Sequence, residues 1–288
     1  MTFCYKKLWK LLIDRGMKKK ELGALAGVSS ATLAKMNKGR TVSTPCFLWL
    51  FIPFLKMCLG ESQIQKKKVE QMKKENQRNF CIAICMLLAF LLWTIAIQVV
   101  DVQAIGPLES SVGFATINQF VHNLTGVHMS LYTITDWLGL VPLMFVIGFG
   151  TLGLIQWIKR KHLLKVEYNI LVLGSFYIVV MAVYVLFEML VVNYRPVLIN
   201  GYLEASYPSS TTMLVMCVMP TAIIQFNSRI KNNVLKRFVA FTIIAFIVFM
   251  VIGRLVSGVH WFTDIIGGAL LSAGLVMMYH AVIRLGVR

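Results

Sequence analysis

Residues 238–283 read FVAFTIIAFIVFMVIGRLVSGVHWFTDIIGGALLSAGLVMMYHAVI. Two apolar runs, 238–253 and 265–283, flank a polar segment that contains Arg254, His260 and Asp264. Each run approaches the ~20 residues with which a helix crosses about 30 Å of hydrocarbon. The stretch therefore predicts two membrane-spanning helices joined by a short loop at one membrane surface.

Four more apolar runs precede this pair. They lie at about 80–100, 137–158, 169–192 and 209–226. The chain of 288 residues is 58% hydrophobic and 14% charged, with a mean hydropathy of +0.73. This composition excludes a water-soluble globular enzyme, and we expect an all-α bundle of six transmembrane helices over residues 80–288.

The net charge of +17 is distributed unevenly. Residues 1–44 carry net +8, residues 45–79 net +4 and residues 80–288 net +5. Basic clusters precede the first span and follow the second, fourth and sixth, so the positive-inside rule predicts a multi-pass cell-membrane protein with both termini in the cytoplasm. Loops 101–136, 193–208 and 254–264 then face outward.

These outward loops contain only two basic residues, Arg195 and Arg254. Because topology removes Lys and Arg from this surface, two remaining arginines suggest a site that binds an anion. The alternative is that each arginine snorkels toward lipid headgroups. The residues around them favour the anion site.

Two neighbouring segments supply the chemistry of such a site. His260 and Asp264 are four residues apart, which places them on one face of a helix, so the carboxylate can orient the imidazole as a base or nucleophile. The segment 207–212, with Ser209 and Ser210, lies at the start of the fourth span, where a helix N-terminus suits a phosphate. We therefore expect an extracytoplasmic phosphate site.

These residues resemble the type 2 phosphatidic acid phosphatase superfamily, which is recognised by the motifs Lys-x6-Arg-Pro, Pro-Ser-Gly-His and Ser-Arg-x5-His-x3-Asp. The third motif is nearly complete, with Gly253 in place of its Ser. The first retains Arg195 and Pro196, but Glu188 replaces its Lys. The second reads Pro-Ser-Ser-Thr over 208–211, so Thr211 replaces its His.

The resemblance implies a membrane lipid phosphatase that works through a phosphohistidine. It implies that His260 attacks phosphorus and Asp264 orients it, and that Arg195, Arg254, Ser209 and Ser210 bind phosphate oxygens. No metal and no cofactor are implied. The partner is then a membrane lipid that carries a phosphate or diphosphate, while the oligomeric state does not follow from the sequence.

The two departures leave three readings open. Thr211 cannot protonate a leaving oxygen, and losing a general acid costs about 10²–10⁴ in rate. In the first, the site acts on a diphosphate, whose leaving group departs as a stable phosphate anion. In the second, His122 or His128 supplies the acid. In the third, the protein has lost catalysis. We expect Glu188 to weaken phosphate binding or to pair with an arginine.

The outer segment 101–136 has a helical pattern. Phe114, Ile117, Val121 and Leu124 recur opposite Asn118, Gln119, His122 and Asn123. This pattern predicts an interfacial helix next to the lipid substrate, or equally a lid that does not contact substrate.

Residues 5–44 form a separate segment. Residues 20–33 read KELGALAGVSSATL, in which a Gly in a turn and the Val next to it are followed by a Ser cap and a helix that carries Thr32 and Leu33. This pattern resembles the Cro/repressor-type helix-turn-helix. The resemblance implies a recognition helix over 30–38 and weak DNA contacts by Ser29, Ser30, Ala31 and Lys35. The alternative is a basic hairpin on anionic lipid. Two helices of such a domain are missing, because residues 45–79 read as an apolar stub, broken by Pro45 and Pro53, and a basic linker or helix. A membrane-tethered DNA-binding regulator is the alternative to an enzyme.

Overall fold

A computed structural model describes residues 9–10, 12–13, 18–25, 28–38 and 44–286. The chain forms two compact units, residues 1–74 and 75–288, and each is described by itself. The described residues are almost entirely helical and contain no strand, only isolated bridges. The prediction of an all-α fold is confirmed.

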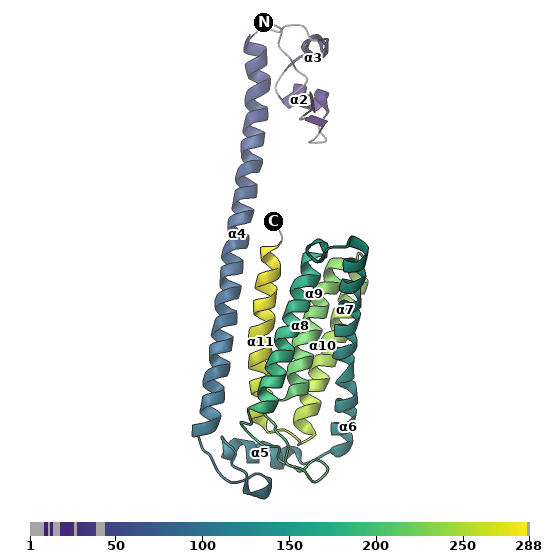
Figure 1. The fold of residues 1–288 in the computed structure, drawn as a ribbon. Helices are drawn as coiled ribbons and strands as arrows, with labels where there is room; N and C mark the ends of the chain where they lie inside the picture. Colours follow the sequence, from purple (N-terminus) through teal and green to yellow (C-terminus); the bar gives the residue numbers. More distant parts are fainter. Residues whose placement is uncertain (1–8, 11, 14–17, 26–27, 39–43, 287–288) are drawn as a thin grey trace. The chain divides into compact units, whose positions relative to one another are not determined.

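The second unit is a bundle of long helices (Figure 1). Its helices α4 and α7–α11 run alternately up and down, so that three of the connections lie at one end and two at the other. The elements, in chain order, are α4 (Thr44–Val99, in this unit from Glu75), η1 (Pro107–Glu109), α5 (Ala115–Thr125), α6 (Met129–Leu138), α7 (Leu140–Arg160), η2 (Leu163–Lys165), α8 (Tyr168–Met189), α9 (Ser210–Arg229), α10 (Asn233–Val256) and α11 (Phe262–Leu285).

Six segments of the described chain are long and apolar enough to cross a membrane, as predicted. Their bounds differ from the sequence expectation: the first span begins at Glu70, where about residue 80 was expected, and two further differences bear on the polar residues singled out above. The second span begins at Met129, because α6 leads into α7 at Gly139, so residues 129–136 are helical and are not loop. The fifth extends to Val256, which places Arg254 inside the last turn of α10.

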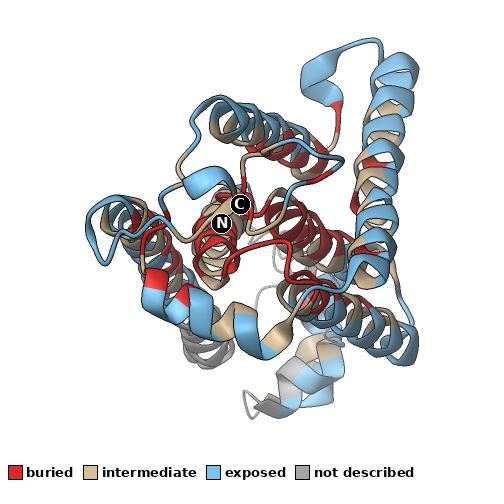
Figure 2. Ribbon diagram, turned by 90° about the horizontal axis from the view of Figure 1, so that it is seen from below, coloured by how far each residue is buried: buried red, intermediate tan, exposed pale blue. Residues whose placement is uncertain are grey.

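Helices α9 and α11 form the centre of the bundle. They have the most buried residues, whereas α4, α7, α8 and α10 expose many large apolar side chains. Figure 2 shows buried residues on the faces that the helices turn toward one another and exposed residues on the outside. Apolar side chains directed outward all along such helices suit a hydrocarbon solvent.

The end of α4 is held by aromatic and hydroxyl groups from distant segments. Phe90 stacks on Tyr207 with ring centroids 6.1 Å apart, and the hydroxyls of Thr94 and Tyr207 are 2.7 Å apart. The Trp93 indole N–H donates to the Thr263 carbonyl at 3.2 Å. These contacts attach the first span to the segments before α9 and at the start of α11.

Helix α5 exists where the outer segment predicts a helix, but its polar face is partly turned inward. Asn118 is fully buried because its amide donates to the Gly113 carbonyl at 2.8 Å and to the Thr263 hydroxyl at 3.0 Å. The apolar side chains of Ile117, Phe120 and Leu124 are exposed. Asn118, which the pattern places on the polar face of the helix, is therefore a buried polar contact.

The first unit contains α2 (Lys19–Leu25) and α3 (Ser30–Asn37). Ser29 caps α3, and its side chain accepts from the Thr32 backbone N–H at 3.3 Å. Ser30, Ala31 and Lys35 are exposed, while Met36 is buried. Much of the predicted helix-turn-helix, including residues 1–8 and 39–43, lies outside the described residues.

The expectation that prolines interrupt residues 45–55 is wrong. Helix α4 begins at Thr44 and continues through both prolines. Pro45 falls in the first helical turn, where a backbone N–H would have no helical partner anyway. Pro53 lies inside the helix and has no N–H to donate, so one backbone hydrogen bond of α4 is absent there.

The close approach of α11 to Tyr207 gives a test of the packing. A Cβ at position 267 would lie 2.3 Å from a Tyr207 ring carbon, and Tyr207 is only 1% exposed. We expect Gly267→Ala to lower the thermal midpoint in detergent, through overpacking of about 1–3 kcal/mol. The matched control is Gly148→Ala in α7, where nothing lies within 4 Å; equal midpoints for the two variants would contradict this packing.

Candidate active site

One end of the bundle gathers the polar residues that the sequence singles out. The connection between α8 and α9 folds back on itself there, with an isolated bridge between Tyr194 and Ala205. In this turn the Ser206 N–H donates to the Asn193 carbonyl at 2.9 Å, and the Arg195 N–H donates to the Glu204 carbonyl at 3.0 Å. The bridge therefore fixes Arg195 and Ser206 in register, next to the connection between α10 and α11.

Asp264 lies in the first turn of α11 and is completely buried. Its carboxylate accepts from the Trp261 backbone N–H at 2.9 Å and from the Asn193 amide at 3.5 Å. The Ser206 hydroxyl also donates to it. These donors account for a buried carboxylate that has no arginine or lysine partner among the described residues.

His260 precedes α11 and is not part of it, so the prediction that His260 and Asp264 share one helix is wrong. The pair still meets, because the turn at Gly258 brings the chain back: His260 Nδ1 is 3.8 Å from Asp264 Oδ2. The Ser206 hydroxyl lies between them, 3.1 Å from His260 Nδ1. Since Ser206 donates to Asp264, its oxygen accepts from an Nδ1–H, and Nε2 keeps its lone pair.

The imidazole is held neutral by its surroundings. Burial lowers the pKa of His260 to about 4, an effect that the Asp264 contact opposes and that Arg195 and Arg254 reinforce. Its Nε2 atom is buried and has no hydrogen-bond partner. A neutral imidazole with a free Nε2 is the form that can act as a nucleophile.

Arg195 and Arg254 are both buried near this histidine. Arg254 is 1% exposed and Arg195 9%, and their guanidinium carbons lie 4.9 Å and 5.8 Å from the centre of the Tyr132 ring. Arg195 Nε lies 3.2 Å from a Glu204 oxygen, without hydrogen-bond alignment, and Arg254 Nη2 lies 3.5 Å from Asp136. Of the two alternatives for Glu188, pairing with an arginine is not found among the described residues, because Glu204 and Asp136 are the partners of Arg195 and Arg254; weakened phosphate binding stays a prediction.

The start of α9 contributes hydroxyl groups. The Ser209 N–H donates to the Asp264 carbonyl at 3.2 Å, while the Ser209 hydroxyl is buried without a partner. Ser210 lines the pocket next to His260. Thr211 is buried and does not line the pocket. Its methyl group lies against Gly139, 3.6 Å from the point where a Cβ would stand at that residue.

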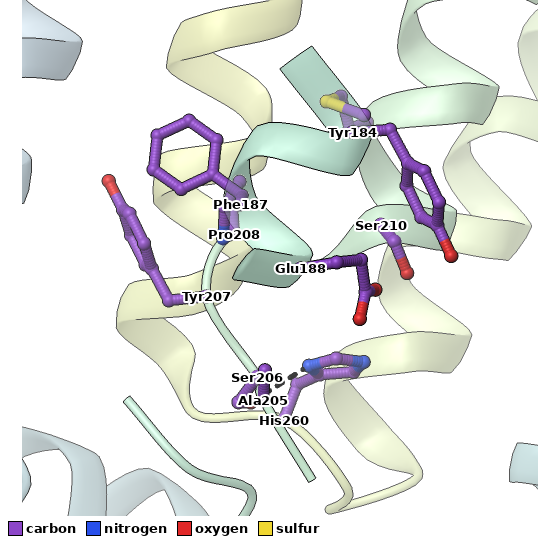
Figure 3. A pocket seen from close by; sticks show the side chains of 10 residues that line it. Tyr184, Phe187, Glu188, Ala205, Ser206, Tyr207, Pro208, Ser210 and His260 are labelled. Carbon is purple, nitrogen blue, oxygen red and sulfur yellow. Dashed lines mark hydrogen bonds between the residues drawn. The ribbon is translucent and has the colours of Figure 1, made fainter. Parts of the chain in front are cut away.

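Figure 3 shows the pocket, which has an empty volume of about 320 Å³ including its open side. Glu188 and Tyr184 reach it from α8, and His260 from the connection before α11. His122 and His128 do not line this pocket. The His122 ring instead packs on Trp261 at 5.5 Å, and His128 Nε2 lies 2.9 Å from the Thr125 carbonyl. The hypothesis that either supplies the acid gains no geometric support.

Sequence reasoning missed several residues that complete the site. Ser206 and Asn193 lie in the predicted loop 193–208, where no pattern marks them, and both contact Asp264. Tyr132 and Asp136 were assigned to a loop, although α6 carries them to the arginines. Of these four residues, only Asp136 is marked in the sequence, because it is one of three acidic residues in a segment, 101–136, that has no Lys or Arg. Among the described residues, no group of three or more His, Cys, Asp or Glu side chains forms a metal site.

The fold and site thus define a membrane protein with a buried histidine and two buried arginines at one end of a helical bundle. The PAP2 superfamily model, for type 2 phosphatidic acid phosphatases, matches residues 143–286, which is half of the chain. The chain belongs to this superfamily. A second model, the Cro/C1-type HTH DNA-binding domain, matches residues 7–45.

The solved structures include one match, the "first transmembrane PAP2 type phosphatidylglycerolphosphate phosphatase from Bacillus subtilis". It is 18% identical, with a TM-score of 0.47, and the match covers 70% of this chain and 95% of that one. No curated protein matches the chain.

The low pKa of His260 predicts a pH-dependent stability. Between about pH 6.5 and about pH 4 the unfolded chain binds a proton on His260 that the folded protein does not, so stability falls as the pH is lowered. We expect the thermal midpoint in detergent to drop less from about pH 7.5 to about pH 5 in His260→Gln than in the wild type. His128→Gln is the control and should keep the wild-type drop; an equal drop in His260→Gln would contradict a buried, neutral His260.

Proposed function

We propose that this protein is a lipid phosphatase that hydrolyses a phosphate or diphosphate ester through a phosphohistidine at His260. The single observation that carries the proposal is a set of buried polar atoms without partners. His260 Nε2, Arg195 Nη1, Arg254 Nε and the Ser209 hydroxyl come from separate segments. Unpaired buried groups are costly, and a phosphate would satisfy the two arginines and the serine together.

In this mechanism the neutral Nε2 of His260 attacks phosphorus. The Nδ1–H stays bonded to Ser206, and Ser206 to Asp264, so the positive charge that develops on the imidazole lies near a carboxylate. Arg195, Arg254, Ser209 and Ser210 bind the equatorial oxygens, whose charge they neutralise in the transition state. A water molecule then hydrolyses the P–N bond.

We infer that the preferred substrate is a lipid diphosphate. Its leaving group is a phosphate monoester, which departs as a stable anion and needs little protonation. Thr211, which stands where the superfamily motif has a histidine, offers none. The exposed apolar face of α5, with Ile117, Phe120 and Leu124, supports a site at the lipid headgroup level.

The proposed orientation follows from charge. The connections after α7 and α9 carry basic clusters, including Lys159 to Lys161 and Lys231, whereas Arg195 and Arg254 at the site end are buried. By the positive-inside rule the site is extracytoplasmic and both termini are cytoplasmic. Labelling introduced cysteines in whole cells, one at Leu124 and one at Lys161, tests this: only the first should react with an impermeant maleimide.

Activity of the purified protein in detergent tests the phosphatase directly. We expect inorganic phosphate release from a prenyl diphosphate, and more slowly from phosphatidic acid. His260→Ala should lower the rate by at least about 10³-fold, because the nucleophile is lost, and His128→Ala should not. Equal release by the wild type and His260→Ala would mean a phosphatase fold that has lost catalysis.

DNA binding is the second candidate function, and the match over residues 7–45 and the capped α3 favour it. We expect the full chain in detergent to bind duplex DNA weakly, with affinity that falls as salt rises. Lys35→Glu in α3 should weaken binding more than Lys20→Glu in α2, which makes the same change of charge. Equal effects would indicate a general basic surface and no recognition helix.

A further inference from the structure

Glu188 is a carboxyl group at the pocket that the mechanism above does not use. It lies near the end of α8 and lines the pocket together with Tyr184, Ser210 and His260. In Figure 3 its carboxylate points toward the His260 ring. The residue that interrupts the first motif is therefore placed where the substrate would bind.

No basic side chain neutralises Glu188 among the described residues. Arg195 forms an ion pair with Glu204, and Arg254 forms one with Asp136. A free carboxylate beside a phosphate would repel it, so the complex is favoured when the carboxyl group keeps a proton between itself and a phosphate oxygen. The position of Glu188 in the pocket therefore lets it share a proton with a bound phosphate.

Four other groups at or near the pocket, Tyr207, Ser206, Thr211 and His260, do not offer a comparable proton. Burial raises the pKa of the Tyr207 hydroxyl, and the Ser206 proton is committed to Asp264. Thr211, at the position of the superfamily's acid, faces Gly139. His260 is the nucleophile in the proposed reaction.

Resting on the proposed function, we propose that Glu188 is the general acid and base of this site. As His260 Nε2 forms its bond to phosphorus, the bond from phosphorus to the leaving oxygen breaks and that oxygen takes the Glu188 proton. The Glu188 carboxylate then accepts a proton from the water that attacks the phosphohistidine. The P–N bond breaks, inorganic phosphate leaves, and both residues return to their starting forms.

This assignment broadens the substrate class of the site. An acid at position 188 lets the site cleave phosphate monoesters, whose leaving alkoxide needs a proton, in addition to diphosphates. The contribution of Glu188 should therefore depend on the leaving group, in the way that general acid catalysis requires.

The test compares two substrates with one tail, lauryl phosphate and lauryl diphosphate, with the full-length protein in detergent. We expect Glu188→Gln to lower kcat about 10²–10⁴-fold on lauryl phosphate and less than about tenfold on lauryl diphosphate. On lauryl phosphate the wild-type rate should fall as the pH rises, because the acid must carry a proton, and the Glu188→Gln profile should lack this fall.

Two controls separate this role from a general effect of charge. Glu109→Gln removes a carboxylate from the outer segment, at a position that does not line the pocket, and should leave both rates unchanged. Glu188→Lys restores the basic residue of the motif. If Glu188→Gln and Glu188→Lys raise the rate on both substrates, Glu188 only repels phosphate and the proposal is overturned. It is overturned equally if Glu188→Gln lowers both rates alike.

The failure of this proposal differs from the failure of the proposed function. If the wild type releases no more phosphate than His260→Ala from either substrate, there is no phosphatase and both fail. If the wild type is active while Glu188→Gln shows no preference between the leaving groups, only the role of Glu188 is lost.

Discussion

The site depends on one buried carboxylate, that of Asp264. It caps α11 through the Trp261 N–H, and it receives the Ser206 hydroxyl and the Asn193 amide from the connection before α9. The carbonyl of the same residue accepts the Ser209 N–H at the start of α9. One residue thus joins the two central helices and the connection that carries Arg195. A buried carboxylate is stable only with such donors, so the geometry around His260 follows from satisfying it.

The second constraint is positive charge in a buried site. Arg254 and Arg195 are nearly inaccessible, but their acidic partners Asp136 and Glu204 have side chains that are 58% and 42% exposed. Separating an ion pair costs little free energy when its exposed member can turn to solvent. A phosphate can therefore take the place of Asp136 and Glu204 at low cost, and the resting pairs keep the arginines in position until it binds.

The sequence was sufficient for the fold, because hydrocarbon imposes length and apolarity on every span. It was also sufficient to bring Arg195, Arg254, His260 and Asp264 together as candidates, since the two arginines stand out in connections poor in basic residues and the other two lie close to Arg254 in the sequence. The extension of the second span to Met129 was not predicted, because Tyr132, Thr133 and Asp136 make the sequence of α6 resemble a loop.

The contacts made by Ser206, Asn193 and Asn118 were not predictable. Each depends on a turn that brings distant segments together, and no local pattern marks it. The surroundings of Thr211 are a similar case: its position at the start of α9 places it near the site, but only the structure shows that its methyl group lies against Gly139 and that it does not line the pocket. Glu188 was noticed as a departure from a motif, whereas its position toward His260 required the structure.

The central claim is that Nε2 of His260 carries the phosphoryl group during turnover. The most direct test is to mix the purified protein with a lipid diphosphate labelled with ³²P in its terminal phosphate, quench in alkali, which preserves a P–N bond, and map the label by mass spectrometry. The account predicts phosphohistidine at His260 in the wild type and none in His260→Ala. Release of labelled phosphate without any phosphohistidine, or the label on another residue, would contradict it.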